Sequence, residues 1–566
     1  MVKKTSTPRR ESWIQLLAVL AIVLSTNLLS SKYHLRLDMT AEGRYTLSPS
    51  TVKLYSELED VITVKVYLDG DLPPGFKRLR NSIRELLEDL SVQAGDNLEY
   101  EFVDPAAGKD EKARMEVYKQ LAKKGLFPTN LEVRDKEKRS EKIVFPGAIF
   151  SYRGKELPLQ LLKSRAGVSP EEMLNNSIEG LEYEFCNALR KVTRPVSRNI
   201  AFLRGHGELP TPEISDAARS LSETYSVDTV EIAERLHALD GYDAIIIARP
   251  TLPFSEKDKF IIDQFIMRGG KTLWFIDKMA IDMDSLTVNS TTISIPWNLN
   301  IEDQLFRYGV RLNDDLIMDL QSAPIPVVTG YTGNTPRQEL FPWPYFPLMD
   351  PASINPIVND LNVVKGEFCS TLDTIQVEGI RKTILLSSSK ASKLQMAPAR
   401  VSLNLLQEPP DPKVFGKKFM PTAALLEGAF TSNFRNRIPE SIRTSSEIGF
   451  LEKGKPTKMI IVSDGDVIRN FVSKRGAVYP LGYDRYTKQS YGNQAFLLNC
   501  VDYLLDDSGV IGLRSKEIRL RLLDTSRLEN SESILWLNVL VPLLVISMAG
   551  MAFFWLRRKR FGRPRT

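Results

Sequence analysis

Few residues in this chain have types and spacings that could do chemistry, and the clearest group is Gly205-His206-Gly207-Glu208. The glycines permit close backbone approach to a ligand, and an imidazole can change its charge near neutral pH. A second group, Ser463-Asp464-Gly465-Asp466, offers two carboxylates that could bind a cation or lie near His206. Both groups also fit plain turns, the first with a locally hydrogen-bonded histidine and the second with solvated carboxylates.

Neither group comes with the partners that an enzyme or a metal site needs. A hydrolase nucleophile sits in a G-x-S-x-G elbow or its cysteine equivalent, and no cysteine lies in one, so buried apolar cysteines are expected. The histidines form no H-x-x-x-H pair. We therefore expect no enzymatic activity, no metal and no cofactor. The residues concerned are Cys186, Cys369 and Cys500, and His34, His206 and His237.

The two candidate loops follow apolar runs that are typical of buried strands. Residues 199–203 precede the first loop and residues 458–462 precede the second. Similar runs at 244–248 and 272–276 alternate with helical stretches, which predicts a doubly wound parallel sheet. Such sheets place ligand sites at the carboxyl ends of their strands, where both loops are expected.

The rest of the middle region divides into parts that differ in their pattern of apolar residues. Residues 35–190 mix strands and amphipathic helices, which predicts an N-terminal α+β domain. Within it we expect a charged hairpin over 131–152 and a helix that begins after Ser169 and ends at about Lys191. Residues 285–450 are irregular, and their Pro-aromatic run at 341–347 excludes a central strand, so we expect an insertion or a second subdomain. The expected order is a basic tail (1–12), a membrane helix (13–31), the α+β domain (32–192), the sheet domain in two parts (193–284 and 451–510) around the insertion (285–450), a linker (511–533), a second membrane helix (534–556) and a basic tail (557–566).

Both ends of the chain carry uncharged apolar segments, at 13–30 and 534–556. As a helix the second is about 34 Å long, enough for a hydrocarbon core of about 30 Å. A cleaved signal peptide is the alternative for the first, but no A-x-A site follows it. We therefore expect an uncleaved anchor at each end, although the mean hydropathy of the whole chain is only −0.18.

The net charge of +5 comes from the flanks of these segments. Residues 1–12 carry +3 and residues 557–566 carry +6, which leaves −4 for everything between. Basic flanks stay in the cytoplasm, so both termini are predicted there, with the central region across the membrane. We expect these basic tails to contact the lipid bilayer. Their charge indicates membrane topology and not a nucleic-acid-binding surface, so no nucleic-acid partner is expected.

Four residues within the expected spans are poorly suited to lipid. Gln15 and Asn27 lie in the first span, and Asn538 and Pro542 in the second. Polar groups in a span often face another helix, and a proline removes a backbone donor in mid-span. We predict that these residues face a membrane partner; tolerance near the helix ends is the alternative for Gln15 and Asn27.

Three sets of stretches, taken together, resemble a known family. They are Arg36–Ser48 (RLDMTAEGRYTLS); Val66–Phe76 (VYLDGDLPPGF) with Glu101–Pro105 (EFVDP); and Phe202–Glu208 (FLRGHGE) with Ile461–Asp466 (IVSDGD) and Asn493–Leu504. Over nearly its whole length the chain resembles the GldG family, the gliding-motility-associated "substrate-binding" component of an ABC transporter in Bacteroidetes.

This resemblance implies a non-catalytic auxiliary subunit of an ABC transporter complex in the inner membrane, with a periplasmic central region. The implied partners are a GldF-like permease and a GldA-like cytoplasmic ATPase, and periplasmic envelope proteins are further candidates. The central sheet is implied to be amidotransferase-like without that enzyme's nucleophile. The alternative function is a membrane-anchored periplasmic module that binds a glycan or a peptidoglycan fragment near His206 and Asp464.

Overall fold

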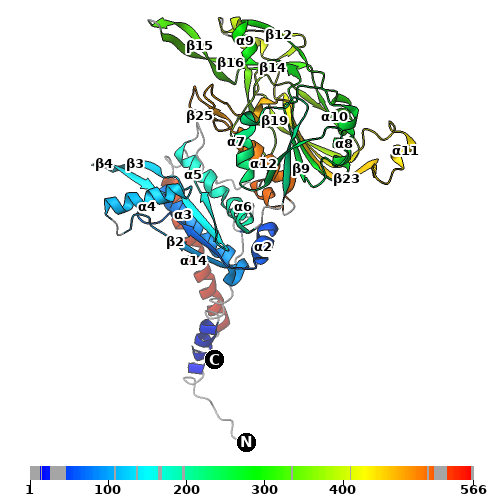
Figure 1. The fold of residues 1–566 in the computed structure, drawn as a ribbon. Helices are drawn as coiled ribbons and strands as arrows, with labels where there is room; N and C mark the ends of the chain where they lie inside the picture. The colour runs from blue at the N-terminus through cyan, green and yellow to red at the C-terminus, as the bar shows by residue number, and fades with distance from the viewer. Residues whose placement is uncertain are drawn as a thin grey trace, which may run out of the picture. The chain divides into compact units, whose positions relative to one another are not determined.

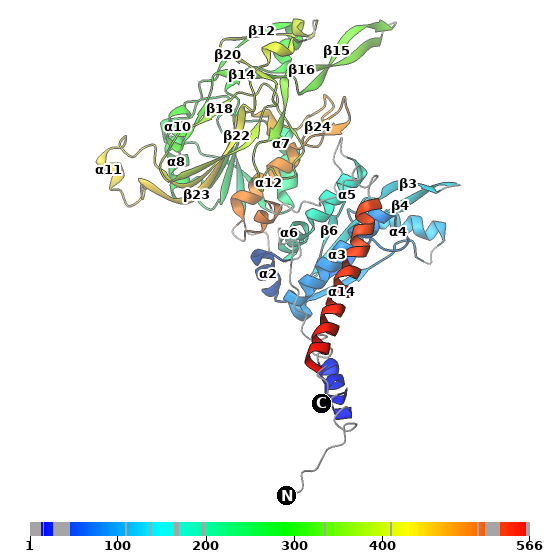
Figure 2. The same ribbon diagram turned by 180° about the vertical axis from the view of Figure 1, so that it is seen from behind.

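The computed structural model describes residues 13–14, 16–25, 46–107, 110–135, 138–162, 169–193, 198–332, 335–407, 410–506, 509–515 and 532–561. The chain forms two compact units, residues 1–517 and residues 518–566. Figures 1 and 2 show the described elements from opposite sides.

The first part of the larger unit, residues 46–193, is a four-stranded sheet packed against helices (Figure 1). Its order is β2-β1-β5-β6, with β1 parallel to β2 and antiparallel to β5. The strands are β1 (Ile62–Val66), β2 (Leu98–Phe102), β5 (Gly147–Tyr152) and β6 (Lys155–Gln160), beside a hairpin of β3 (Thr129–Asp135) and β4 (Lys138–Val144). The helices are α2 (Pro49–Ser56), α3 (Pro74–Ala94), η1 (Gly95–Asn97), α4 (Glu111–Lys123), α5 (Pro170–Glu179) and α6 (Leu181–Thr193).

Two elements of this part differ from the expectation. The charged hairpin expected over 131–152 ends at Val144, because Ala148 and Phe150 are buried and place β5 in the central sheet. The helix expected after Ser169 is divided into α5 and α6, with Gly180 at the C-cap of α5. In addition, η5 (Val510–Ser515) returns from the end of the second part and buries three apolar side chains in this core.

The second part contains the largest sheet, which is mixed. Five strands are parallel in the order β8-β7-β9-β10-β23. Numbered along the chain, that order is 2-1-3-4-5, one of the common doubly wound arrangements. The strands are β7 (Asn199–Arg204), β8 (Ser226–Glu231), β9 (Ala244–Ala248), β10 (Lys271–Phe275) and β23 (Lys453–Val462). The predicted α/β character is confirmed; the amidotransferase-like type stays a prediction.

Alternate residues of the parallel strands enter two separate cores. Phe202 of β7 packs on one face with residues of α7 and α12, and Leu203 packs on the other face with residues of α8 and α10. Figure 1 shows these helices on the two sides of the sheet. The helices of the second part are α7 (Thr211–Ser222), α8 (Glu256–Met267), α9 (Met283–Val288), α10 (Glu302–Tyr308), η2 (Leu403–Leu406), η3 (Pro412–Val414), α11 (Glu440–Arg443), η4 (Asp466–Ile468) and α12 (Asn493–Leu505).

The segment 285–450, expected as an insertion or a second subdomain, adds strands to the same sheet. β22 pairs antiparallel with β23, and β19, β16 and β15 continue outward. The Pro-aromatic run lies in β16, where Phe341, Pro342 and Pro347 pair with β15 and residues 343–346 fall in an irregularity of the register. The pairing of β16 with β17 and β19 begins only at Leu348 and Asp350, so the prolines of this run interrupt no second ladder. These strands are β15 (Ser322–Thr332), β16 (Thr335–Pro351), β17 (Val364–Lys365), β19 (Ile380–Ser387) and β22 (Pro421–Thr431).

Short strands form four small sheets around this one. They are β11 (Met279–Ala280), β12 (Thr291–Pro296) and β21 (Ala399–Ser402); β13 (Val310–Leu312) and β18 (Leu372–Thr374); β14 (Asp315–Asp319) and β20 (Ser392–Met396); and β24 (Tyr483–Asp484) and β25 (Gln489–Ser490).

The smaller unit contains α14 (Glu532–Phe561). Within the described residues, Asn538–Lys559 is the one helix long and apolar enough to cross a membrane. The other predicted span is described as helix only over residues 13–14 and 16–25, and Leu16–Ser25 is too short to pass the same test. The first span and the two-pass topology therefore stay predictions, and Gln15 and Asn27 lie outside the described residues.

Candidate functional site

The loops after β7 and β9 meet at the point where the order of the parallel strands reverses, which is where such sheets bind ligands. Here the loops contact each other directly: the amides of Thr251 and Leu252 both donate to the carbonyl of His206 at 2.9 Å. Gly207 adopts φ +71°, and a Cβ there would lie 2.3 Å from the Thr251 hydroxyl. The glycine is therefore required by close contact between two loops of the protein itself.

His206 is buried and bonded at both ring nitrogens. Its Nδ1 lies 3.2 Å from Glu208 Oε1, and its Nε2 lies 3.1 Å from Asp258 Oδ2. The ring also stacks on Phe254, with 3.8 Å between the ring centroids. Burial opposes the charged imidazole, but hydrogen bonds and charges from the two carboxylates outweigh it and raise the pKa of His206. The geometry is that of a locally satisfied histidine, and a ligand role for this loop stays a prediction.

Asp464 and Asp466 lie in a second buried group, together with Asp277. One oxygen from each of the three carboxylates lies within 4.8 Å of the other two. Asp277 follows β10 and the other two follow β23, its parallel neighbour in the sheet. The prediction missed Asp277, although an acid directly after an apolar strand was the signal that singled out Asp464.

Two guanidinium groups share this carboxylate cluster. Arg249 Nε donates to Asp277 Oδ2 at 2.5 Å, and Arg469 donates to Asp466 at 3.0 Å. Burial and the charge of Asp277 raise the pKa of Asp466, against the opposing charge of Arg249. Three close carboxylates could hold a cation, but here arginines already supply positive charge to the cluster.

Asp464 is completely buried and bonded to Cys369. The Cys369 thiol donates to Asp464 Oδ2 at 2.7 Å, and the amide of Glu367 donates to the same oxygen at 2.7 Å. Burial and the charges of Asp277 and Asp466 raise the pKa of Asp464 well above its usual range. Burial, followed by the charge of Asp464, also raises the pKa of the Cys369 thiol, so the thiol is a donor here and not an activated nucleophile.

The two predicted groups are not bonded to each other. Among the described residues His206 pairs with Glu208 and Asp258, and Asp464 pairs with Cys369 and two backbone amides. The other cysteines are also buried, and burial raises the pKa of Cys186 to about 12. Buried thiols agree with the expectation of apolar, unreactive cysteines.

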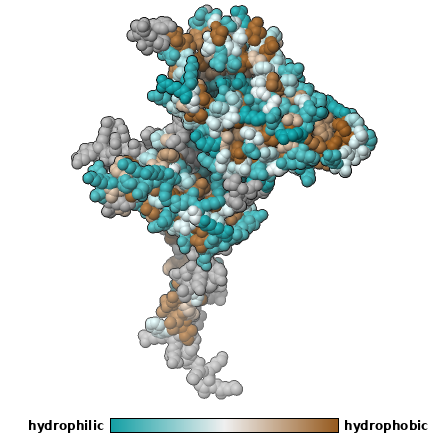
Figure 3. Space-filling view, in the orientation of Figure 1, coloured by the Kyte–Doolittle hydropathy of each residue, from teal (hydrophilic) through white to brown (hydrophobic). Residues whose placement is uncertain are grey.

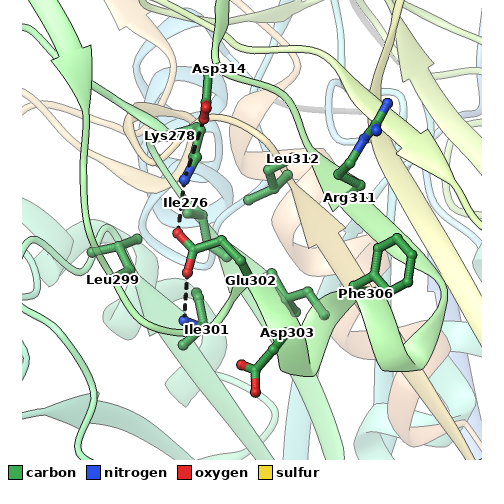
Figure 4. Close-up of a pocket in the computed structure, with 11 residues that line it drawn as sticks. Ile276, Lys278, Leu299, Ile301, Glu302, Asp303, Phe306, Arg311, Leu312 and Asp314 are labelled. Atoms are coloured by element: carbon green, nitrogen blue, oxygen red, sulfur yellow. Dashed lines mark hydrogen bonds and ion pairs between the residues drawn. The ribbon is translucent and has the colours of Figure 1, made fainter.

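A cavity of about 380 Å³ lies beside the end of β10, and the sequence gave no sign of it. Lys278 projects into it (Figure 4), with its Nζ 2.8 Å from Glu302 and 3.4 Å from Asp314. The Glu302 carboxylate also accepts from the amide of Ile301 at 3.0 Å. The lining is Ile276, Lys278, Leu299, Ile301, Glu302, Asp303, Leu305, Phe306, Arg311, Leu312 and Asp314. Its size and mostly apolar walls with a few charged groups are typical of small-ligand sites.

Comparison with known protein families shows which family this chain belongs to. Residues 197–500, the part that carries the large sheet, match the family described as an ABC-type uncharacterized transport system, whose members are transporter auxiliary proteins. The chain belongs to this family. Residues 41–151 match a domain of unknown function. A protein of Borreliella burgdorferi, itself uncharacterized, is 20% identical over 541 residues, which are 93% of this chain and 94% of that protein.

Solved structures give weaker similarity. The N-terminal domain of mmIFT52 is 13% identical with a TM-score of 0.32, over 55% of this chain and 98% of that one. A ThuA-like protein of Parabacteroides merdae is 11% identical with a TM-score of 0.26, over 55% of this chain and 90% of that one. Such scores do not establish a shared fold.

Family membership supports a transport-associated role and implies association with permease and ATPase subunits. Together with α14 it also indicates membrane association.

Proposed function

We propose that this protein is a non-catalytic inner-membrane subunit of an ABC transporter complex linked to gliding motility. Its spans bind a GldF-like permease, a GldA-like ATPase completes the complex, and both termini lie in the cytoplasm. The central region faces the periplasm, where it recruits an envelope partner or carries a load. The observation that carries the proposal is the family match over residues 197–500.

The chemistry of the candidate loops supports a role without catalysis. His206 has carboxylates on both nitrogens, and Cys369 is a buried thiol that donates to Asp464. General base and nucleophile catalysis requires groups that can reach a substrate. Neither side chain meets that requirement, since both are buried and bonded within the protein.

Two residues of α14 offer a way to test the permease contact. Asn538 and Pro542 are four positions apart and therefore lie on one face of the helix. An exposed amide in lipid is costly, whereas an amide that faces another helix can bond to it. Ser547 is nine positions from Asn538, which turns it about 180° to the opposite face, so Ser547→Leu is a matched control.

The experiment is purification of the full chain from native membranes in mild detergent. We expect the permease and the ATPase to co-elute, and Asn538→Leu to lower permease recovery while Ser547→Leu leaves it unchanged. Absence of both subunits from the eluate would contradict the proposal. Intact gliding after deletion of this chain would contradict the link to motility. Equal permease recovery with both variants would contradict the prediction that the Asn538 face of α14 contacts the permease.

A second candidate function is a membrane-anchored periplasmic module that binds a glycan or a peptidoglycan fragment. The observation that favours it is the cavity beside β10, which opens at the ligand-binding edge of the parallel strands. A thermal-shift screen with envelope glycans tests it, with Lys278→Met and His206→Ala as variants. A shift that disappears in one variant would place the ligand, and no shift with any glycan would exclude the module.

A further inference from the structure

The segment from Phe471 to Tyr491, which connects β23 to α12, carries stacked aromatic rings. Tyr479 lies 5.6 Å from Phe471 and 5.9 Å from Tyr483, measured between ring centroids, and the two tyrosine rings are parallel within 7°. We call it the aromatic-cationic segment. It is the orange-brown loop marked β25 in Figure 1 and β24 in Figure 2, and its side of the molecule is mostly hydrophilic in Figure 3.

The backbone of this segment is held in place by hydrogen bonds. The strands β24 and β25 pair within it, and the amide of Ser473 donates to the carbonyl of Ala477 at 2.8 Å. Leu481 is buried in the main core, and its amide donates to the carboxylate of Asp216 at 2.7 Å. The rings are therefore presented on a fixed scaffold, which lowers the entropy lost when a ligand binds.

An arginine lies among these rings. The guanidinium carbon of Arg485 is 4.1 Å from the centre of the Phe471 ring and 4.5 Å from that of Tyr486. The side chains of Phe471 and Tyr486 are 39% and 40% exposed. Parts of both rings are thus covered by the arginine, while the remainder faces solvent beside a positive charge.

Four exposed cations in this segment have no carboxylate partner among the described residues: Lys474, Arg475, Arg485 and Lys488. The acid of the segment, Asp484, is buried and accepts from the amide of Tyr486 at 2.8 Å. Elsewhere exposed arginines such as Arg153 and Arg381 reach carboxylates within 3.3 Å. Unpaired cations on a fixed aromatic surface leave a site complementary to negative charge.

We propose that the aromatic-cationic segment binds an acidic saccharide, a chain whose sugar rings carry carboxylates. A pyranose offers a face of C–H groups, which packs on the negative face of an aromatic ring, while its carboxylates attract the four cations. The surface contains both requirements within 21 residues of chain. The inference rests on the second candidate function, and it assigns the ligand to this segment instead of the cavity beside β10 or the His206 loop.

The observations favour a saccharide over other negatively charged occupants. Protein interfaces are depleted in lysine at their centre and use a desolvated pocket, whereas two of these cations are lysines and the rings are only part-exposed. A bilayer surface requires large apolar side chains that insert below the headgroups, but the most exposed large hydrophobic residue of the segment, Val478, is only 41% exposed.

The test is direct binding of defined probes to the full chain in detergent. The probes are oligogalacturonate, an uncharged dextran oligomer of equal length, a poly-glutamate peptide and anionic phospholipid vesicles. We expect oligogalacturonate to bind most tightly and more weakly as salt rises. Stronger binding of poly-glutamate or of vesicles, or equal binding of dextran, would overturn the proposal.

Variants locate the binding. Arg485→Gln and Tyr486→Ala are each expected to weaken oligogalacturonate binding about tenfold, whereas Tyr486→Phe keeps the ring and the affinity. Arg400→Gln, which removes an exposed cation on β21, is the control. If Lys278→Met abolishes binding and the Arg485 and Tyr486 variants do not, the glycan module stands and the assignment to this segment fails. If the wild-type chain binds none of the saccharide probes, both the glycan-binding module and its assignment to this segment are contradicted.

Discussion

The carboxylate cluster around Asp464 and the aromatic-cationic segment are separated by a few residues of chain, yet they treat charge in opposite ways. In the cluster, carboxylates and guanidinium groups are buried and bonded to one another. In the segment, four cations are exposed and lack carboxylate partners among the described residues. Buried charge pairs hold the fold together, because removal of one partner leaves the other charge buried without a partner or water. An exposed, unpaired charge is solvated at little cost and remains available to a ligand.

The largest expected effect separates a buried arginine from an exposed one. Arg249→Met removes the partner of Asp277 and brings three carboxylates together without that cation, so we expect the free energy of unfolding to fall by about 3–5 kcal/mol. Urea denaturation of the detergent-solubilised chain measures it. Arg475→Met is the control and should leave the transition unchanged; similar losses in both would remove the distinction between the two regions.

A glycine of the buried His206 loop and a glycine of the aromatic-cationic segment extend the comparison to backbone contacts. Gly207→Ala places a Cβ 2.3 Å from the Thr251 hydroxyl, whereas Gly476, at a similar φ of +79°, has nothing within 4 Å. We expect Gly207→Ala to lower the free energy of unfolding by about 1–3 kcal/mol more than Gly476→Ala, because backbone strain is shared and only the contact differs. Equal midpoints in thermal denaturation would show that the loop contact is not tight.

The pH dependence of stability tests the buried histidine. The folded pKa of His206 is raised, so its contribution is fully present below the unfolded value of about 6.5 and is lost as pH rises through the folded value. We expect the free energy of unfolding of His206→Asn to fall less over this pH range than that of the wild-type chain. The expected difference between the two declines is about 1–2 kcal/mol. The measurement is urea denaturation over a pH series, and His237→Asn, which removes an exposed histidine, should keep the wild-type decline.

The smallest effect is expected in the aromatic-cationic segment itself. Lys474→Gln combined with Arg475→Gln should change the free energy of unfolding by less than about 0.5 kcal/mol, because neither side chain has a charged partner to lose. Thermal denaturation at low and high salt measures it. A larger loss would mean that these cations stabilise the fold and would weaken the contrast on which the saccharide proposal depends.

Local pattern predicted much of the fold. The apolar runs at 199–203, 244–248, 272–276 and 458–462 all lie in or at the ends of parallel strands of one sheet, and the apolar run at 534–556 lies within α14. Such runs report the burial of a strand or a helix without any knowledge of its neighbours. The same patterns did not predict that the strands of segment 285–450 belong to the large sheet. These strands pair antiparallel, and the prolines of the Pro-aromatic run occur where β16 has a single partner.

The candidate site was predicted less well. Gly207 and Asp464 were correctly placed after strands, but the cavity beside β10 and the pairing of Cys369 with Asp464 were not foreseen. Cys369 is 95 positions from Asp464. No local pattern relates residues at that separation, because their contact depends on how distant strands are ordered in the sheet.

By itself the sequence determined the apolar strands, the turns that follow them, the charge of the tails and the apolar stretch within α14, since each of these is a property of consecutive residues. Only the tertiary structure decided which charges are paired. β10 and β23 are neighbours in the sheet although Asp277 and Gly465 are 188 positions apart, and this places Arg249 and three carboxylates in one buried cluster. The same packing leaves the cations of residues 474–488 in solvent, because electrostatic partners are set by distance in space and by burial, neither of which the order of residues specifies.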